Sequence, residues 1–156
     1  MLFFKKKQKD NSNYSVRFPV PKKLDKEYTF TVVGTEHLSK EIAKLGTPSK
    51  WYNASKEMLK TSNKGRHYEY YFGDLFYSMV PEPGNPYDNK AIAVFANAIK
   101  IGYVPAVLTD IVRAYMKHKN VRVSGSLLGG NYIVQDFGKW SKVNGSYFCE
   151  ITITLP

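Results

Sequence analysis

Residues 81–94 read PEPGNPYDNKAIAV, and this stretch decides how the rest of the chain is interpreted. Its first half spreads three prolines, a glycine and an asparagine over six residues, a composition typical of a turn. Its second half, residues 91–94, is a short apolar run that favours a strand. Tyr87 and Asp88 lie between the two halves, so they either shape the turn or contact a ligand.

The chain around this stretch is strongly basic. Its 156 residues include 23 Lys and Arg against 13 Asp and Glu, which gives a formal net charge of +10. An excess of this size favours a phosphate-rich partner, so nucleic acid is the leading partner class and an anionic membrane surface ranks behind it. Residues 71–100 hold two basic and three acidic residues and are the only part without a basic excess. The quoted stretch lies within that part.

Length and cysteine content narrow the class of protein. A chain of 156 residues is expected to form one domain with one core. The single cysteine, Cys149, can form no internal disulfide, which favours a reducing compartment. The N-terminal MLFFKKKQK has an apolar run too short for a signal peptide or a spanning helix. We therefore expect a cytoplasmic protein without a membrane partner, whose first ten or so residues are a solvated basic tail.

Strand-like segments outnumber helical ones. The expected strands, rich in β-branched and aromatic residues, are 28–34, 68–81 with an interruption at Gly73 and Asp74, 91–96, 99–104, 121–128, 132–137 and 147–155. Asn97 and Ala98 give a weak hairpin signal, and residues 129–131 give a strong one. Helices are expected from Pro105 onward, at 39–45 and at 49–60. This order favours a mainly β fold, a small OB-like β-barrel with two or three short helices.

The central block of the chain resembles the HIRAN domain. Residues 80–108, VPEPGNPYDNKAIAVFANAIKIGYVPAVL, contain that family's proline- and asparagine-rich turn, Tyr-Asp pair, strand start and Gly-Tyr-hydrophobic-Pro run before a helix. Upstream, FTVVGTEHL at residues 30–38 resembles the family's first strand. We accordingly divide the chain into a basic tail and lead-in, residues 1–27, and a HIRAN-like domain, residues 28–156. The domain has an insertion at about 46–70 and an extra strand at about 147–155.

The resemblance implies a modified OB-like barrel that binds single-stranded DNA, in the best-understood case at a free 3′ end. A 3′-terminal sugar carries a hydroxyl, so the Asp88 carboxylate could accept a hydrogen bond there, whereas it would repel a phosphate. Tyr87 could stack on or pack against the terminal base. The other candidate contacts are Asn85, Tyr103, His37 and Tyr132.

Five of the six candidates also have a structural interpretation. Asp88 could accept backbone amides as an Asx turn, and Tyr87 could be a core or rim ring. Asn85 could only shape the loop, and Tyr103 and Tyr132 could be plain strand residues.

The chain departs from the family pattern at two positions. Glu36 stands where the DNA-binding member has an arginine, and Ala106 where it has a lysine, so two expected phosphate contacts are missing. The basic residues that could replace them are Lys56, Lys60, Lys64 and Arg66 in the insertion, or those at the end of the helix, although a solvated basic face is the simpler interpretation.

Two other functions compete with DNA binding. Asp74, Asp88 and Lys90 superficially match a metal-dependent nuclease, although Asp88 falls in a proline-rich turn instead of mid-strand. An adaptor that binds a peptide in an aromatic groove would explain the aromatic residues but not the charge. We therefore predict a non-catalytic module without cofactor or metal. Its expected partners are single-stranded DNA or DNA ends, with a separately encoded helicase or nuclease.

Overall fold

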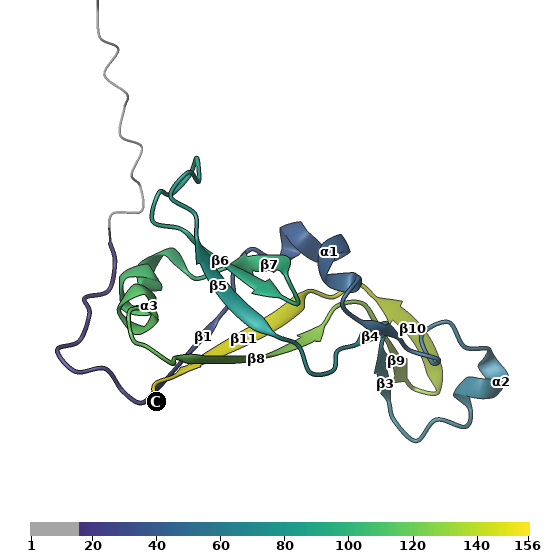
Figure 1. Cartoon of the computed structure of the whole chain (residues 1–156). Coiled ribbons are helices and arrows are strands. Elements are labelled where there is room, and N and C mark those ends of the chain that lie inside the picture. The colour runs from purple at the N-terminus through teal and green to yellow at the C-terminus, as the bar shows by residue number, and fades with distance from the viewer. Residues whose placement is uncertain (1–15) are drawn as a thin grey trace, which may run out of the picture.

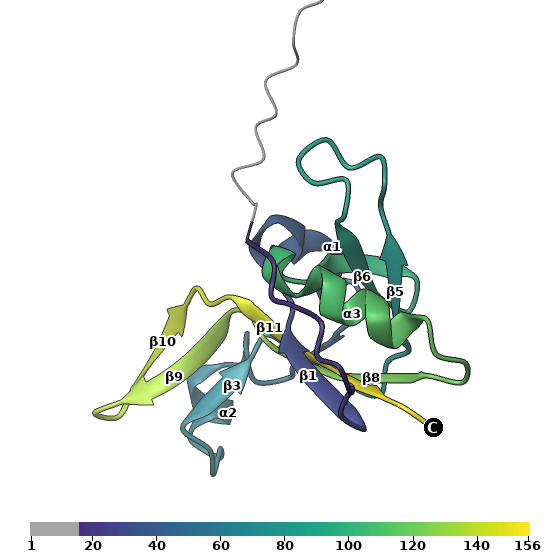
Figure 2. The same cartoon turned by 90° about the vertical axis from the view of Figure 1, so that its left-hand side faces the viewer.

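The computed structural model describes residues 16–156 and shows a mainly β protein with short helices. The predicted basic tail of about ten residues lies outside the described part. The strands form four hydrogen-bonded sheets, and these are arranged as two lobes (Figures 1 and 2). We call them the core lobe, which contains β1, β5–β8, β11, α1 and α3, and the outer lobe, formed by residues 47–71 and 130–145.

The first sheet of the core lobe has the strand order β1-β11-β8 and is antiparallel. Its strands are β1 (Glu27–Thr31), β11 (Tyr147–Thr154) and β8 (Arg122–Gly129). Cys149, Ile151 and Ile153 of β11 are fully buried, whereas the residues between them are not. The alternation in the sequence thus correctly predicts the last strand and its inner face.

The second sheet of the core lobe has the order β5-β6-β7, with β5 (Tyr77–Pro81), β6 (Ile92–Ala96) and β7 (Ile99–Tyr103). The predicted hairpin of β6 and β7 is confirmed, and Asn97 and Ala98 turn it with φ values of 46° and 64°. Ile92 and Val94 contribute fully buried side chains to the same core as β11. The residues of the quoted stretch that precede β6 therefore form a loop held at the edge of a packed sheet.

The helices of the core lobe are short. A 3₁₀ turn at Ala106–Leu108 leads into α3 (Thr109–Met116), and another at Thr35–Leu38 leads into α1 (Ser39–Ala43), so both predicted helices are confirmed. Val112 and Tyr115 of α3 are buried in the core. Within residues 16–156, no helix has the length and apolar character needed to cross a membrane.

The outer lobe combines most of the expected insertion with a hairpin from later in the chain. Its main sheet has the order β10-β9-β3, with β3 (Arg66–Tyr68), β9 (Tyr132–Asp136) and β10 (Lys139–Val143). β2 (Thr47–Pro48) pairs with β4 (Tyr70–Tyr71). Ser55 caps the N-terminus of α2 (Lys56–Leu59), because its Oγ accepts a hydrogen bond from the Met58 amide at 3.2 Å. The segment predicted as one interrupted strand, 68–81, is divided among β3, β4 and β5.

Three sequence-based expectations are revised by this arrangement. The sheets are not closed into a barrel, so the OB-like barrel is not confirmed. The hairpin predicted between 121–128 and 132–137 is wrong, because β8 pairs with β11 whereas β9 pairs with β10 and β3. Gly129 and Gly130, with φ values of 95° and 82°, instead carry the chain from one lobe to the other. The helix predicted at 49–60 is confined to α2, since Trp51 stacks on the His67 ring of β3.

Residues 16–26 form no helix or strand but are attached to the core lobe at several points. The Phe18 amide donates to the Val107 carbonyl at 2.8 Å. The Tyr115 hydroxyl of α3 donates to the Asp25 carbonyl at 3.0 Å. This lead-in therefore follows α3 before the chain enters β1 (Figure 2).

Gly102 explains why the GYVP motif needs a glycine on β7. Its φ is 157°, and a Cβ placed there would lie 2.5 Å from the Val33 carbonyl oxygen and 2.6 Å from Val32 Cγ1. We expect Gly102→Ala to lower the free energy of unfolding by about 1–3 kcal/mol, because the packed backbone has no room for a methyl group. Denaturant unfolding measures this change. The matched control is Gly73→Ala, where no atom lies within 4 Å of the added methyl group, and equal losses in the two variants would contradict the prediction.

Candidate nucleic-acid interface

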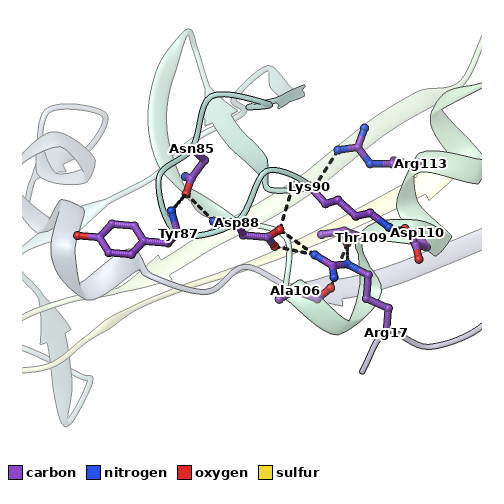
Figure 3. Close-up of polar contacts among 9 residues, drawn as sticks. All are labelled: Arg17, Asn85, Tyr87, Asp88, Lys90, Ala106, Thr109, Asp110 and Arg113. Carbon is purple, nitrogen blue, oxygen red and sulfur yellow. Dashed lines mark hydrogen bonds and ion pairs between the residues drawn. The ribbon is translucent and has the colours of Figure 1, made fainter. Parts of the chain in front are cut away.

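The loop between β5 and β6 is shaped by Asn85. Its Oδ1 accepts hydrogen bonds from the amides of Tyr87 at 2.9 Å and Asp88 at 3.1 Å, which folds the NPYD segment into a tight turn (Figure 3). Asn85 therefore shapes the loop, and it also lines the pocket described below. The turn leaves Tyr87 with 86% of its surface exposed, so the ring is no core residue.

Asp88 is held by an arginine from the lead-in. Nη2 of Arg17 donates to Asp88 Oδ1 at 2.8 Å and Oδ2 at 2.9 Å, while Nε of Arg17 donates to the Thr109 hydroxyl at 2.9 Å. Asp88 Oδ1 also accepts from the Lys90 amide at 2.9 Å, which is the predicted Asx turn. The side chains of the ion pair are only 15% and 17% exposed. In Figure 3 the Tyr87 ring and the Arg17 guanidinium lie on opposite sides of Asp88.

Glu82 organises the opposite side of the loop. Its Oε1 accepts from the Tyr103 hydroxyl at 3.0 Å and from Asn85 Nδ2 at 3.2 Å, and its carboxylate forms an ion pair with Lys100. Nζ of Lys100 in turn donates to the Tyr103 hydroxyl at 3.2 Å. The hydrogen bond with Lys100 lowers the pKa of Glu82, and the same bond raises the pKa of Lys100. Glu82 therefore couples Asn85 to the ring on β7.

We expect Glu82→Gln to destabilise the protein at neutral pH and much less in acid. Because the pKa of Glu82 is lowered in the folded state, its contribution is complete above the ordinary value of 4.5 and is lost as the pH falls through the lowered value. Denaturant unfolding of wild type and variant, at about pH 7 and about pH 3, measures the difference in the free energy of unfolding. An equal difference at both pH values would show that the Glu82 charge contributes nothing.

Five of the six predicted site residues line one pocket. This cavity of about 680 Å³ is bordered by Asn85, Tyr87, Asp88, Tyr103 and His37, and the lining also includes Val33, Glu82, Pro86, Ala91, Val104 and Ala106. His37 and Tyr103 are brought together because the Val33 and Tyr103 backbones exchange two hydrogen bonds, each 2.9 Å. The structure thus brings together five of the predicted residues, from the NPYD loop, β7 and the turn after β1.

Tyr132, the sixth predicted residue, does not belong to this pocket. It lies on β9 in the outer lobe, opposite Tyr68 of β3, and the Arg66 guanidinium sits 4.4 Å above its ring centre. β9 pairs with β3 and β10 and not with β8, which places Tyr132 in the outer lobe. Tyr132 is therefore separate from the other five.

One of the two departures from the family pattern, Ala106, lines this pocket. The other, Glu36, is not a lining residue but lies beside His37, with 3.4 Å between a Glu36 carboxylate oxygen and the imidazole Nε2. Two cations near Asp88 come instead from positions that are distant in the sequence. Arg17 contacts it directly, and Arg113 donates to the Lys90 carbonyl at 3.0 Å, close to the loop (Figure 3).

The nuclease interpretation requires carboxylates that are grouped closely enough to hold a metal ion. Within residues 16–156, no group of three or more His, Cys, Asp or Glu side chains is placed to hold a metal ion. Asp74 is not among the residues that line the pocket of Asp88.

Comparison with known proteins identifies the central block. No curated protein and no solved structure gave a significant match to the chain. The family model of the HIRAN domain matches residues 65–134, a span that includes the NPYD loop, the β6–β7 hairpin and α3. The resemblance seen in the sequence is thereby confirmed for residues 65–134, which match the HIRAN domain.

Proposed function

We propose that this protein is a non-catalytic module that binds single-stranded DNA and recognises its 3′-hydroxyl end in the NPYD pocket. HIRAN domains are generally nucleic-acid-binding modules, and the net charge of +10 fits a polyanionic partner. The observation that carries the finer proposal is the juxtaposition of an exposed ring, Tyr87, and a fixed carboxylate, Asp88, in one cavity of about 680 Å³.

The Asp88 carboxylate retains capacity for a ligand hydroxyl despite its ion pair. A carboxylate offers about four lone-pair sites. Among the described residues, Oδ1 accepts two hydrogen bonds, from Arg17 and the Lys90 amide, whereas Oδ2 accepts one, from Arg17. One site on Oδ2 therefore remains for a sugar hydroxyl, and Arg17 holds the carboxylate in place for it.

Cations around the loop would supply the phosphate contacts that Glu36 and Ala106 cannot make. Lys90 is half-exposed and lies 3.8 Å from Asp110, a weak pairing that leaves its ammonium accessible to a strand. Arg113 borders the same loop. Lys90 and Arg113 would contact the phosphates upstream of the terminal nucleotide. A helicase or nuclease would act on the end that the module holds.

The test compares two oligonucleotides that differ only at the 3′ end. Fluorescence anisotropy with a 3′-hydroxyl and a 3′-phosphate strand should show tighter binding of the hydroxyl form by roughly tenfold or more, because a hydrogen bond to a charged group contributes about 1.5–3 kcal/mol. Equal affinity for both ends would overturn end recognition. Cleavage of the strand in Mg²⁺ or Mn²⁺ that disappears in Asp88→Ala would overturn the non-catalytic role.

A further inference from the structure

The outer lobe concentrates positive charge away from the NPYD loop. Residues 47–71 and 130–145 contain seven basic and three acidic residues, an excess of four. The basic residues are Lys50, Lys56, Lys60, Lys64, Arg66, Lys139 and Lys142. They come from the insertion and from the β9–β10 hairpin, which Figures 1 and 2 both show at the end of the molecule remote from α3.

Three of these cations lie against aromatic rings. Lys50 Nζ is 5.0 Å from the Trp51 ring centre, Lys142 Nζ is 4.5 Å from that of Tyr52, and Arg66 Cζ is 4.4 Å from that of Tyr132. Within residues 16–156, Lys60 is the one outer-lobe cation with a carboxylate within 4 Å, that of Glu57. A ring keeps a cation in place without neutralising it. The charge of the lobe therefore remains available to an anion.

One face of the outer lobe's main sheet carries two tyrosine rings and an arginine that are suited to stacking with nucleobases. Tyr68 pairs directly with Tyr132 across β3 and β9, and Arg66 pairs with Val134, so all four side chains share a face. The two tyrosine rings meet edge to face at 5.7 Å, and both are half-buried, whereas Arg66 is exposed. Rings beside an arginine on a sheet are a platform on which single-stranded bases stack.

The other face of the sheet is covered by the insertion. His67, which is only 3% exposed, stacks between Trp51 and Trp140 with ring centres 4.9 and 5.8 Å away. This packing fixes the segment that carries Lys50. A cleft of about 460 Å³ opens beside it, and its walls include Lys50, Trp51, Asn63 and Lys64. Two lysines from opposite ends of the insertion thus border one cleft.

We propose that the outer lobe is a second nucleic-acid contact, which binds the body of the single strand whose 3′ end occupies the NPYD pocket. Lys50, Lys64, Arg66 and Lys142 contact phosphates, and the Tyr132 platform takes a base. The proposal rests on the proposed function for its choice of strand, because its own observations are the uncompensated charge and the rings. It gives the insertion a role: to lengthen the binding surface beyond the terminal nucleotides.

The test uses strand length as its variable. The lobe variant Lys64→Gln/Arg66→Gln/Lys142→Gln replaces three exposed residues, and the matched control Lys22→Gln/Lys23→Gln/Lys119→Gln removes the same charge from exposed positions outside the outer lobe. Oligothymidylates of about 4 and about 16 nucleotides, all with a 3′-hydroxyl, are titrated by anisotropy. Binding of the longer strand should weaken in the lobe variant, and its salt slope should fall by about 0.7 for each lost phosphate contact. Binding of the shorter strand should stay at the control level.

The outcomes separate this proposal from end recognition. If the lobe variant binds the longer strand with the affinity and salt slope of the control, the proposal is overturned, and the lobe serves another polyanion or an acidic protein. If wild type shows no 3′-hydroxyl preference but the lobe variant still loses long-strand affinity, only end recognition fails. Thermal unfolding checks the fold of each variant, and Lys50→Gln/Lys64→Gln offers a second variant at the cleft.

Discussion

Replacing Asp88 with alanine is expected to erase the preference for a 3′-hydroxyl over a 3′-phosphate end. The wild-type carboxylate accepts a hydrogen bond from the hydroxyl and repels a phosphate, so its removal weakens the first ligand and favours the second. A discrimination of roughly tenfold or more should fall to about one, which corresponds to the loss of a charged hydrogen bond of about 1.5–3 kcal/mol. Anisotropy titrations of both oligonucleotides with both proteins measure the change.

Arg17→Ala is the matched control, because both substitutions break the same partly buried ion pair. In the Arg17 variant the carboxylate remains but is no longer neutralised by that guanidinium, so it repels a 3′-phosphate more strongly. The hydroxyl preference should therefore persist, although strands with either end should bind more weakly because Arg17 no longer holds the carboxylate and its loop in place. If the two variants lost the preference equally, Asp88 would act only through the structure of the loop, and its role in reading the end would be refuted.

Tyr87→Ala should weaken the binding of single-stranded DNA regardless of its end chemistry. Stacking of a base on an aromatic ring contributes about 1–3 kcal/mol by alanine substitution, which corresponds to roughly 5- to 150-fold in affinity. The ring is 86% exposed and its loop is held by the Tyr87 backbone amide, so the fold should not change. Both 3′-hydroxyl and 3′-phosphate strands should lose affinity by a similar factor.

Phe76→Ala is the control for this effect. Phe76 is 87% exposed, like Tyr87, but it does not line the pocket. Its removal should leave DNA affinity unchanged. Comparable losses in the two variants would mean that general surface hydrophobicity is responsible, and would contradict a stacking role for Tyr87.

Elements whose signals are local could be predicted from the sequence. The alternation in β11, the β6–β7 hairpin and the helix after Pro105 each depend on residues within one segment, and all three are confirmed. Five of six site residues converge for a related reason, since the HIRAN resemblance fixes the relation of the NPYD turn to β7. Tyr132 lies apart from the other five because β9 pairs with β3 and β10 and not with β8. A glycine-rich turn changes the direction of the chain, but long-range packing decides which strand pairs with the strand that follows the turn.

Contacts between distant segments escaped prediction. Arg17 is 71 residues from Asp88, and nothing in its sequence context distinguishes it from the other basic residues of a chain that has 23. Glu82 lies inside the quoted stretch, but its partners Lys100 and Tyr103 become neighbours only when β5 and β7 flank β6 in one sheet. The roles of Arg17 and Glu82 are visible only in the side-chain contacts of the structure, whereas composition showed only that residues 71–100 lack a basic excess.

The attachment of Arg17 has a practical consequence for the choice of fragment. A fragment beginning at Tyr28, the expected start of the domain, would retain nearly all of β1 and every later strand and helix. It would nonetheless deprive Asp88 of its guanidinium partner and the Tyr115 hydroxyl of the Asp25 carbonyl. Such a fragment could give the circular dichroism of a folded protein while its end-binding carboxylate is no longer fixed. The smallest piece with an intact site therefore starts upstream of the first regular element, and the limits of the fold and of the site do not coincide.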